Sequence, residues 1–185
     1  MLTTLQKQKF DNYFRHLDRD GDGVIEWEDF EAVVENIRTA RGWEAQDERH
    51  RRLVEAQRYY WQKLSEIVDT DGDGKISPAE FQAFHESIGR EIDAQGKPPA
   101  WAVALVHAYH RVLDANGNGT IGVNEYAVYL KALGATTEPA EAFGRLDLDR
   151  DGKIDIDEME ELYTQYVISN NPSDPGNYLS TGSID

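Results

Sequence analysis

Apolar residues recur three and four positions apart along most of the chain, which is the spacing of one helix face. Phe10, Phe14 and Leu17 form the first such stripe, and Phe30 and Val34 belong to the second. The further stripes comprise Leu53, Tyr60, Leu64 and Val68; Phe81, Phe84, Ile88 and Ile92; Trp101, Leu105, Tyr109 and Val112; Tyr126, Leu130 and Leu133; Phe143 and Leu146; and Met159, Leu162, Tyr166 and Val167. The pattern predicts an all-α fold in which helices flank short polar stretches.

Four of the polar stretches are twelve-residue repeats that align without gaps. In chain order, as loops 1 to 4, they read DRDGDGVIEWED at 18–29, DTDGDGKISPAE at 69–80, DANGNGTIGVNE at 114–125 and DLDRDGKIDIDE at 147–158. Each has Asp at position 1, Asp or Asn at positions 3 and 5, Gly at position 6, Ile at position 8 and a carboxylate at position 12. Because apolar stripes flank every loop, we expect four helix-loop-helix units.

The loops also carry most of the charge. The chain of 185 residues has 35 acidic and 19 basic residues and a formal net charge of −16, and the loops hold 18 of the acidic residues but four of the basic ones. Such acidity disfavours binding to phosphate backbones and anionic lipid, so nucleic acid is not an expected partner. The absence of cysteine excludes disulfides, thiolate metal sites and a cysteine nucleophile.

Oxygen donors at this spacing suit calcium. The ion takes about six to eight oxygens, and a twelve-residue loop supplies them from positions 1, 3, 5, 7, 9 and 12, with position 7 using its backbone carbonyl. Gly at position 6 permits a sharp turn, and Ile at position 8 favours a short strand that pairs with the neighbouring loop. The expected metal ligands are Asp18, Asp20, Asp22, Val24, Glu26 and Asp29; Asp69, Asp71, Asp73, Lys75, Ser77 and Glu80; Asp114, Asn116, Asn118, Thr120 and Glu125; and Asp147, Asp149, Asp151, Lys153, Asp155 and Glu158.

The four loops differ in their donors. Loops 2 and 4 have a full set, whereas loop 3 has Asn116 and Asn118 in place of carboxylates and Gly122 at position 9, so a water is expected to complete its shell. Loop 1 ends in Asp29, one methylene shorter than Glu, which favours six ligands over seven and so favours magnesium relative to the other loops. We therefore expect up to four calcium ions, with magnesium competing most strongly at loop 1.

The spacing of the loops predicts how the chain is organised. Their first residues are 51, 45 and 33 positions apart. The long first interval predicts an extended helical stretch around Arg38–Tyr60, and Gln95–Pro99 predicts a break between the halves. The expected parts are an N-terminal pair with loops 1 and 2 (1–94), a C-terminal pair with loops 3 and 4 (95–168), and a tail (169–185) that frays by default, with Tyr178 and Leu179 as its candidate anchors.

Neither an export signal nor a membrane span is visible in the sequence. The start, Met1–Phe14, has polar residues where a secretory signal needs an unbroken apolar stretch. The longest apolar-leaning run, Ala100–Tyr109, is about half the roughly 20 residues that cross a bilayer. We expect a cytoplasmic protein that does not insert into membranes, and a monomer.

The loops resemble the EF-hand calcium loop, and with their flanking helices the resemblance covers nearly the whole chain up to about Val167. The uneven intervals, the aromatic-rich helices and the size resemble the sarcoplasmic calcium-binding protein family, including its bacterial relative calerythrin. That resemblance implies two EF-hand pairs packed into one compact body, short β-ribbons between paired loops, and a role in buffering calcium. Family members often have one degenerate loop, commonly the second, but loop 2 is intact here, so four sites are expected.

Two other kinds of calcium-binding function stay open. A sensor that grips a protein target usually offers a methionine-rich groove, and this chain has only Met1 and Met159. Its four tryptophans favour a closed interior, although an aromatic pocket for a dedicated target is a possible alternative. The other alternative is a luciferin-binding or photoprotein-like member of the same family, yet no histidine follows His110, so the C-terminal His of photoproteins has no counterpart.

Enzymatic function is not expected. Pairs of carboxylates can perform acid-base chemistry, but each dense pair here is explained by metal coordination. The sequence has neither a glycine-rich phosphate loop nor a recognisable nucleophile arrangement.

Overall fold

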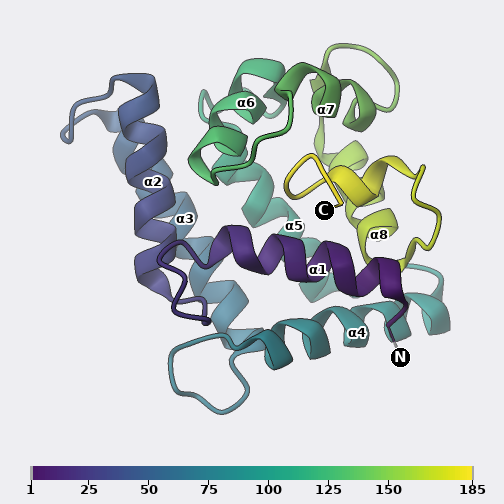
Figure 1. Cartoon of the computed structure of the whole chain (residues 1–185). Coiled ribbons are helices and arrows are strands. Elements are labelled where there is room, and N and C mark those ends of the chain that lie inside the picture. Colours follow the sequence, from purple (N-terminus) through teal and green to yellow (C-terminus); the bar gives the residue numbers. More distant parts are fainter. Residues whose placement is uncertain (1, 185) are drawn as a thin grey trace.

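The computed structural model describes residues 2–184, which form eight α-helices, one 3-10 segment and a two-stranded sheet (Figure 1). The predicted all-α class with EF-hand units is confirmed. No helix within this range is long and apolar enough to cross a bilayer. The elements are α1 (Thr4–Leu17), α2 (Trp27–Arg41), α3 (Glu48–Val68), α4 (Pro78–Gln95), α5 (Ala100–Leu113), β1 (Ile121–Gly122), α6 (Val123–Ala132), α7 (Pro139–Leu146), β2 (Lys153–Ile154), α8 (Ile156–Ile168) and η1 (Pro175–Tyr178).

Local sequence signals set the ends of several helices. The Thr3 side chain accepts a backbone hydrogen bond at the start of α1, and Ser77 does the same for α4, where Pro78 is the first helical residue. Gly42 and Gly96 end α2 and α4 in the left-handed conformation, with φ of 64° and 73°. Ser77 and Glu80 together form a capping box at the start of α4, a pairing that Ser followed by Glu three residues later favours.

Short antiparallel contacts join the loops in pairs. In the first pair, Ile25 and Ile76 exchange backbone hydrogen bonds of 2.9 and 2.8 Å. In the second pair, Ile121 of β1 is opposite Ile154 of β2. All four isoleucines are at most 1% exposed, so position 8 of each loop both pairs with its neighbour and anchors the loop to the core.

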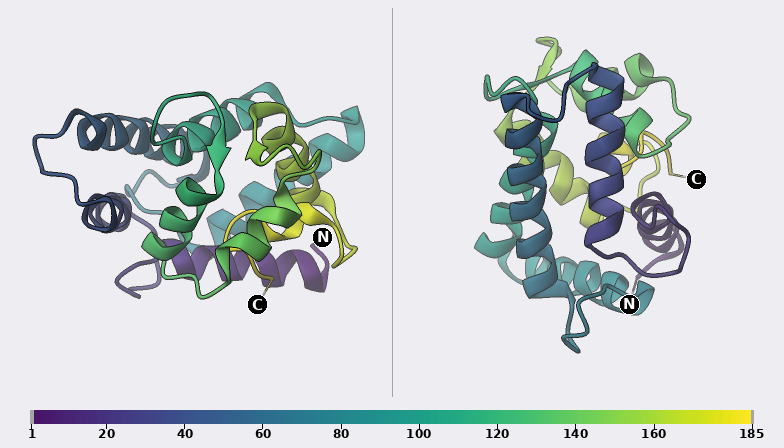
Figure 2. Two further views of the ribbon diagram at one scale, coloured as in Figure 1. Left: turned by 90° about the horizontal axis from the view of Figure 1, so that it is seen from above. Right: turned by 90° about the vertical axis from the view of Figure 1, so that its left-hand side faces the viewer.

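Helices of the two halves interleave. The helix α2 packs against α6, α3 against α5, and α4 against α8. Figure 2 shows α2 and α3 running alongside each other at one side of the molecule. Two side chains of the N-terminal half also bind the last turn of α6: Arg19 donates to the Leu133 carbonyl, and Asn36 donates to the Ala132 carbonyl over 3.1 Å. Loop 1 is thereby connected to the unit that contains loop 3.

The chain between loops 1 and 2 differs from its prediction. The extended helical stretch expected around Arg38–Tyr60 is interrupted, because α2 ends at Arg41 and α3 begins at Glu48. Gly42 adopts a left-handed conformation that few other residues tolerate, and Asp47 caps α3 by accepting a hydrogen bond from the Arg49 amide. The two helices can therefore fold back on each other.

The C-terminal tail is ordered, so the default of a frayed terminus is wrong. The buried Lys9 ammonium of α1 lies 2.7 Å from the Asn177 side-chain oxygen, and the Asn12 amide donates to the Thr181 hydroxyl over 2.9 Å. Asn177 and Thr181 are fully buried, and Leu179 is 5% exposed. The tail is held because polar groups of α1, some 170 residues away in sequence, have their partners in it.

Aromatic side chains fill the interior around a small central cavity. Phe10, Ile88 and Leu162 are fully buried in this core. The cavity has a volume of about 40 Å³ and is lined mainly by tyrosine and phenylalanine rings, with Tyr13 and Tyr109 among them. It has room for a few water molecules.

Candidate metal sites

The backbone of each loop turns at two left-handed residues. The Gly at position 6 has φ between 84° and 93° in all four loops, as expected from the sequence. Position 4 is also left-handed, and here loop 4 has Arg150, with φ of 63°, where loops 1 to 3 have glycine. Arg150 is the one non-glycine residue with positive φ within 2–184. This second turn was not among the features expected from the sequence, although Gly recurs at position 4 of loops 1 to 3.

The carboxylate at position 1 holds each loop closed. In loop 1, Asp18 accepts hydrogen bonds from the amides of Gly21 and Gly23, at 2.8 and 3.0 Å. The carboxylate oxygens of Asp69, Asp114 and Asp147 accept equivalent bonds from the position 6 amides of their own loops. The turn around the cation site is therefore formed by side chain to backbone bonds of the loop itself.

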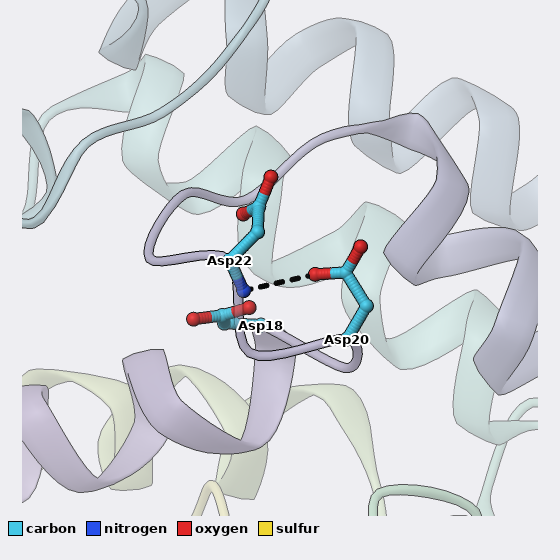
Figure 3. A group of neighbouring side chains, drawn as sticks. All are labelled: Asp18, Asp20 and Asp22. Atoms are coloured by element: carbon cyan, nitrogen blue, oxygen red, sulfur yellow. Dashed lines mark hydrogen bonds between the residues drawn. The ribbon is translucent and has the colours of Figure 1, made fainter.

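The donors at positions 3 and 5 face the same space. Figure 3 shows Asp18, Asp20 and Asp22 around loop 1, with the Asp22 amide donating to Asp20. In this triad, one carboxylate oxygen of each residue lies within 4.8 Å of the others. The same limit holds for Asp69, Asp71 and Asp73 in loop 2 and for Asp147, Asp149 and Glu158 in loop 4. Like charges this close repel one another unless a cation lies between them.

Loop 3 uses amide oxygens where the others use carboxylates. The oxygen atoms of Asn116 and Asn118 take the same local bonds as the aspartates elsewhere, accepting from the amides of Asn118 and Thr120 at 3.0 and 2.9 Å. Asp114 and Glu125 supply its carboxylates. Loop 3 therefore has the geometry of the other loops with less negative charge.

The carboxylate at position 12 ties the exiting helix to both ends of the loop. In loop 2, Glu80 accepts from the Thr70 amide at 2.8 Å and from the Ser77 amide at 2.9 Å. The same residue completes the capping box of α4, so helix start and candidate ligand coincide. Equivalent bonds are accepted by Asp29 from Arg19 and Glu26, by Glu125 from Asn116 and Gly122, and by Glu158 from Leu148 and Asp155.

The pKa of the position 12 carboxylate is shifted in opposite directions in loops 1 and 2. Backbone hydrogen bonds, chiefly from Ser77, lower the pKa of Glu80 to about 2. In loop 1, burial raises the pKa of Asp29 above its usual value, and the nearby Asp20 and Asp18 add to the effect. Asp29 is 4% exposed. The shorter residue therefore sits deeper and is harder to keep charged without a cation.

Position 9 is engaged by protein groups. The Ser77 hydroxyl donates to Glu80 over 2.8 Å, and Asp155 accepts from the Glu158 amide over 2.9 Å. Glu26 lies 2.8 Å from the ammonium of Lys75 in the neighbouring loop. At position 7, the amides of Val24, Lys75, Thr120 and Lys153 donate to the side chains at position 5. The structure thus brings together positions 1, 3 and 5 in loops 1 and 2, and positions 1, 3 and 12 in loop 4. Carboxylate oxygens grouped in this way suit a hard dication.

Two EF-hand family models match parts of the chain. The EF-hand domain pair matches residues 7–86, which contain loops 1 and 2. The EF hand matches residues 140–163, which contain loop 4.

Curated relatives match nearly the full length. Calerythrin of Saccharopolyspora erythraea is 28% identical over 162 residues, which covers 86% of this chain and 90% of calerythrin. Sarcoplasmic calcium-binding proteins I, III and IV of Branchiostoma lanceolatum are 25% identical over 181 residues, or 96% of this chain and 97% of theirs. The expectation of a binding protein rather than an enzyme is confirmed by these relatives.

Solved structures share the fold. The sarcoplasmic calcium-binding protein from amphioxus has a TM-score of 0.68 at 22% identity, with 98% of each chain covered. A calcium-binding protein of Streptomyces coelicolor has a TM-score of 0.64 at 27% identity, covering 88% of this chain and 97% of its own. The coelenterazine-binding protein from Renilla muelleri, at 20% identity and a TM-score of 0.66, shares the fold over 95% of this chain and 96% of its own. The chain is therefore an EF-hand calcium-binding protein that is similar over most of its length to calerythrin and the sarcoplasmic calcium-binding proteins.

Proposed function

We propose that this protein is a cytoplasmic calcium buffer or carrier that binds up to four calcium ions, one in each loop. The ligands are those expected at positions 1, 3, 5, 7, 9 and 12. The observation that carries the proposal is that backbone amides already hold the position 1 and position 12 carboxylates of all four loops in one arrangement. A cation then meets preformed sites. The names of the similar sarcoplasmic calcium-binding proteins support calcium as the bound ion.

The closed interior favours a buffer over a sensor. A sensor exposes a flexible apolar groove on loading, whereas Met159 is 2% exposed and packed in the core. Within residues 2–184, Tyr59 and Val123 are the exposed large apolar side chains, at 44% and 38%. They lie on different helices, α3 and α6. We propose that calcium tightens this core without opening it.

A sensor remains the second candidate because of one relative. The Streptomyces coelicolor structure is described as a basis for prokaryotic calcium-mediated regulation. Binding of a fluorescent apolar dye separates the two candidates: a buffer should bind less dye after calcium is added to the chelator-stripped protein. A large, reversible increase in dye binding on loading would favour the sensor.

A luciferin-binding role gains no support from the cavity. A photoprotein-like function needs a cavity large enough for an organic ligand. The central cavity has a volume of only about 40 Å³, because aromatic side chains occupy most of the interior. Sites for organic ligands typically have several hundred Å³. The coelenterazine-binding neighbour shares the fold at 20% identity, which carries no ligand to this chain.

Stoichiometry tests the central proposal. Flow dialysis of chelator-stripped protein is expected to give four bound calcium ions per chain, and Glu158→Gln is expected to bind one fewer because it removes a charged donor from loop 4. Scattering should show one compact monomer in both states, as the proposed packing of the 1–94 and 95–168 pairs requires. A wild-type value of two or less would contradict the proposal.

Loop 1 is proposed as the site where magnesium competes best. Asp29→Glu should raise the preference of loop 1 for calcium over magnesium by about tenfold, because the longer side chain reaches a bidentate position. Glu80→Asp is the reciprocal change in loop 2 and should lower that preference. Calcium titrations at millimolar magnesium, followed by NMR at each loop, measure both. Equal magnesium sensitivity of all four loops in the wild type would contradict the assignment.

A further inference from the structure

A lysine of loop 2 reaches into the donor set of loop 1. The Lys75 ammonium lies 2.8 Å from a carboxylate oxygen of Glu26 and 4.0 Å from one of Asp22. Glu26 and Asp22 occupy positions 9 and 5 of loop 1, whereas Lys75 occupies position 7 of loop 2, where only its backbone carbonyl is an expected donor. Its side chain is therefore available for contacts with the neighbouring loop.

The register of the paired loops explains this contact. The antiparallel bridge between Ile25 and Ile76 brings Glu26 opposite Lys75. The second pair has the same register, with Gly122 opposite Lys153. Because glycine has no side chain, Lys153 faces no carboxylate there, and no salt bridge of Lys153 is found within residues 2–184. The chain thus contains the same lysine position twice, once with an acidic partner and once without.

We propose that Lys75 sets the calcium affinity of loop 1. It holds Glu26 in an ion pair and thereby weakens calcium binding at that loop. To become a direct ligand, Glu26 must leave the ammonium. A positive charge beside the site also repels an entering dication. The contact is half exposed, with 43% of the Lys75 and 24% of the Glu26 side chain accessible, so the effect is moderate and screened by salt. The inference rests on the proposed binding of calcium by loop 1.

The test compares two matched variants. Lys75→Met and Lys153→Met each remove one positive charge from the same ribbon position while keeping the backbone carbonyl. Calcium titrations followed by NMR report each site through its position 6 amide: Gly23 donates to Asp18 in loop 1 and Gly119 donates to Asp114 in loop 3. We expect Lys75→Met to raise the calcium affinity of loop 1 by about threefold to tenfold. This gain should exceed the gain at loop 3, the loop that Lys153 faces, in Lys153→Met by at least about threefold.

A second background isolates the ion pair. In Glu26→Gln, the further change Lys75→Met should give loop 1 only the gain that Lys153→Met gives loop 3, because the partner carboxylate is gone. Raising the salt concentration should shrink the excess gain in the wild-type background. Equal gains at loops 1 and 3, or an unchanged Lys75→Met effect in Glu26→Gln, would overturn the inference while leaving calcium binding intact. If Gly23 fails to respond to calcium in every variant, the proposed function of loop 1 fails as well.

Discussion

Arg150 shows at the scale of one residue how the loop geometry constrains side chains. It occupies position 4 of loop 4 with a φ of 63°, where the other three loops have glycine. A side chain in this left-handed conformation costs about 1 kcal/mol, because Cβ crowds the following carbonyl. Loop 4 therefore retains backbone strain that glycine prevents in loops 1 to 3.

Replacing Arg150 tests that strain. Arg150→Gly should stabilise the protein relative to Arg150→Ala by about 0.5–1 kcal/mol, since both remove the charge but only glycine relieves the backbone. Urea unfolding in chelator measures the difference without metal. If alanine proves as stable as glycine, position 4 of loop 4 is not strained.

Burial of His85 predicts a pH dependence of stability. The His85 ring is 3% exposed and stacks on Phe10 with 4.2 Å between the ring centroids, and burial lowers its pKa from 6.5 to about 4. Below pH 6.5 the unfolded chain binds a proton that the folded chain does not, so stability falls as pH drops from 6.5 to about 4. The loss at pH 5 is about 2 kcal/mol.

His85→Gln provides the comparison for this prediction. The variant should be less stable at pH 7 but should lose about 2 kcal/mol less than the wild type between pH 7 and pH 5. Protonation of the loop carboxylates is common to both proteins and cancels in the difference. Parallel pH profiles in denaturant unfolding would show that His85 does not titrate in this way.

At the scale of elements, the tail shows how one small residue permits docking. A Cβ on Gly176 would lie 2.3 Å from the Leu162 carbonyl oxygen and 2.8 Å from the Tyr166 amide. Those atoms belong to the backbone of α8, which cannot move aside without breaking the helix. The segment η1 can therefore approach α8 only because residue 176 is glycine.

Gly176→Ala should release the tail. We expect a loss of about 1–3 kcal/mol in stability and faster hydrogen exchange and proteolysis between residues 170 and 184. Gly144→Ala in α7 is the matched control, since nothing lies within 4 Å of its added Cβ, and a helix gains about 0.5–1 kcal/mol from the change. An unaltered tail in Gly176→Ala would contradict the docking described.

At the scale of the whole molecule, the two halves share one core. The helices α2 and α6 pack together across them, and Arg19 and Asn36 bind the end of α6. We therefore expect a single cooperative unfolding transition in saturating calcium. Chelation should lower its midpoint, because each ion at 100 times its dissociation constant adds about 2.7 kcal/mol. Calorimetry with two separate transitions in calcium would show that the halves unfold independently.

The sequence by itself determined what depends on neighbours along the chain. The four loops with their acidic and amide side chains, the capping box at Ser77 and the apolar helix faces all follow from local spacing and turn chemistry. Two features with local signals were not predicted. The break at Gly42 was hidden by the helical periodicity on either side of it, and the positive φ of Arg150 was not expected because only the Gly at position 6 was considered as a turn residue.

Only the tertiary structure decided what depends on partners distant in sequence. Lys9 and Asn12 order a tail some 170 residues away, Lys75 meets Glu26 across the ribbon, and Arg19 reaches the end of α6. No periodicity encodes such contacts, since each depends on where two separately folded elements come to lie. Burial, which sets the pKa directions of His85 and Asp29, arises in the same way.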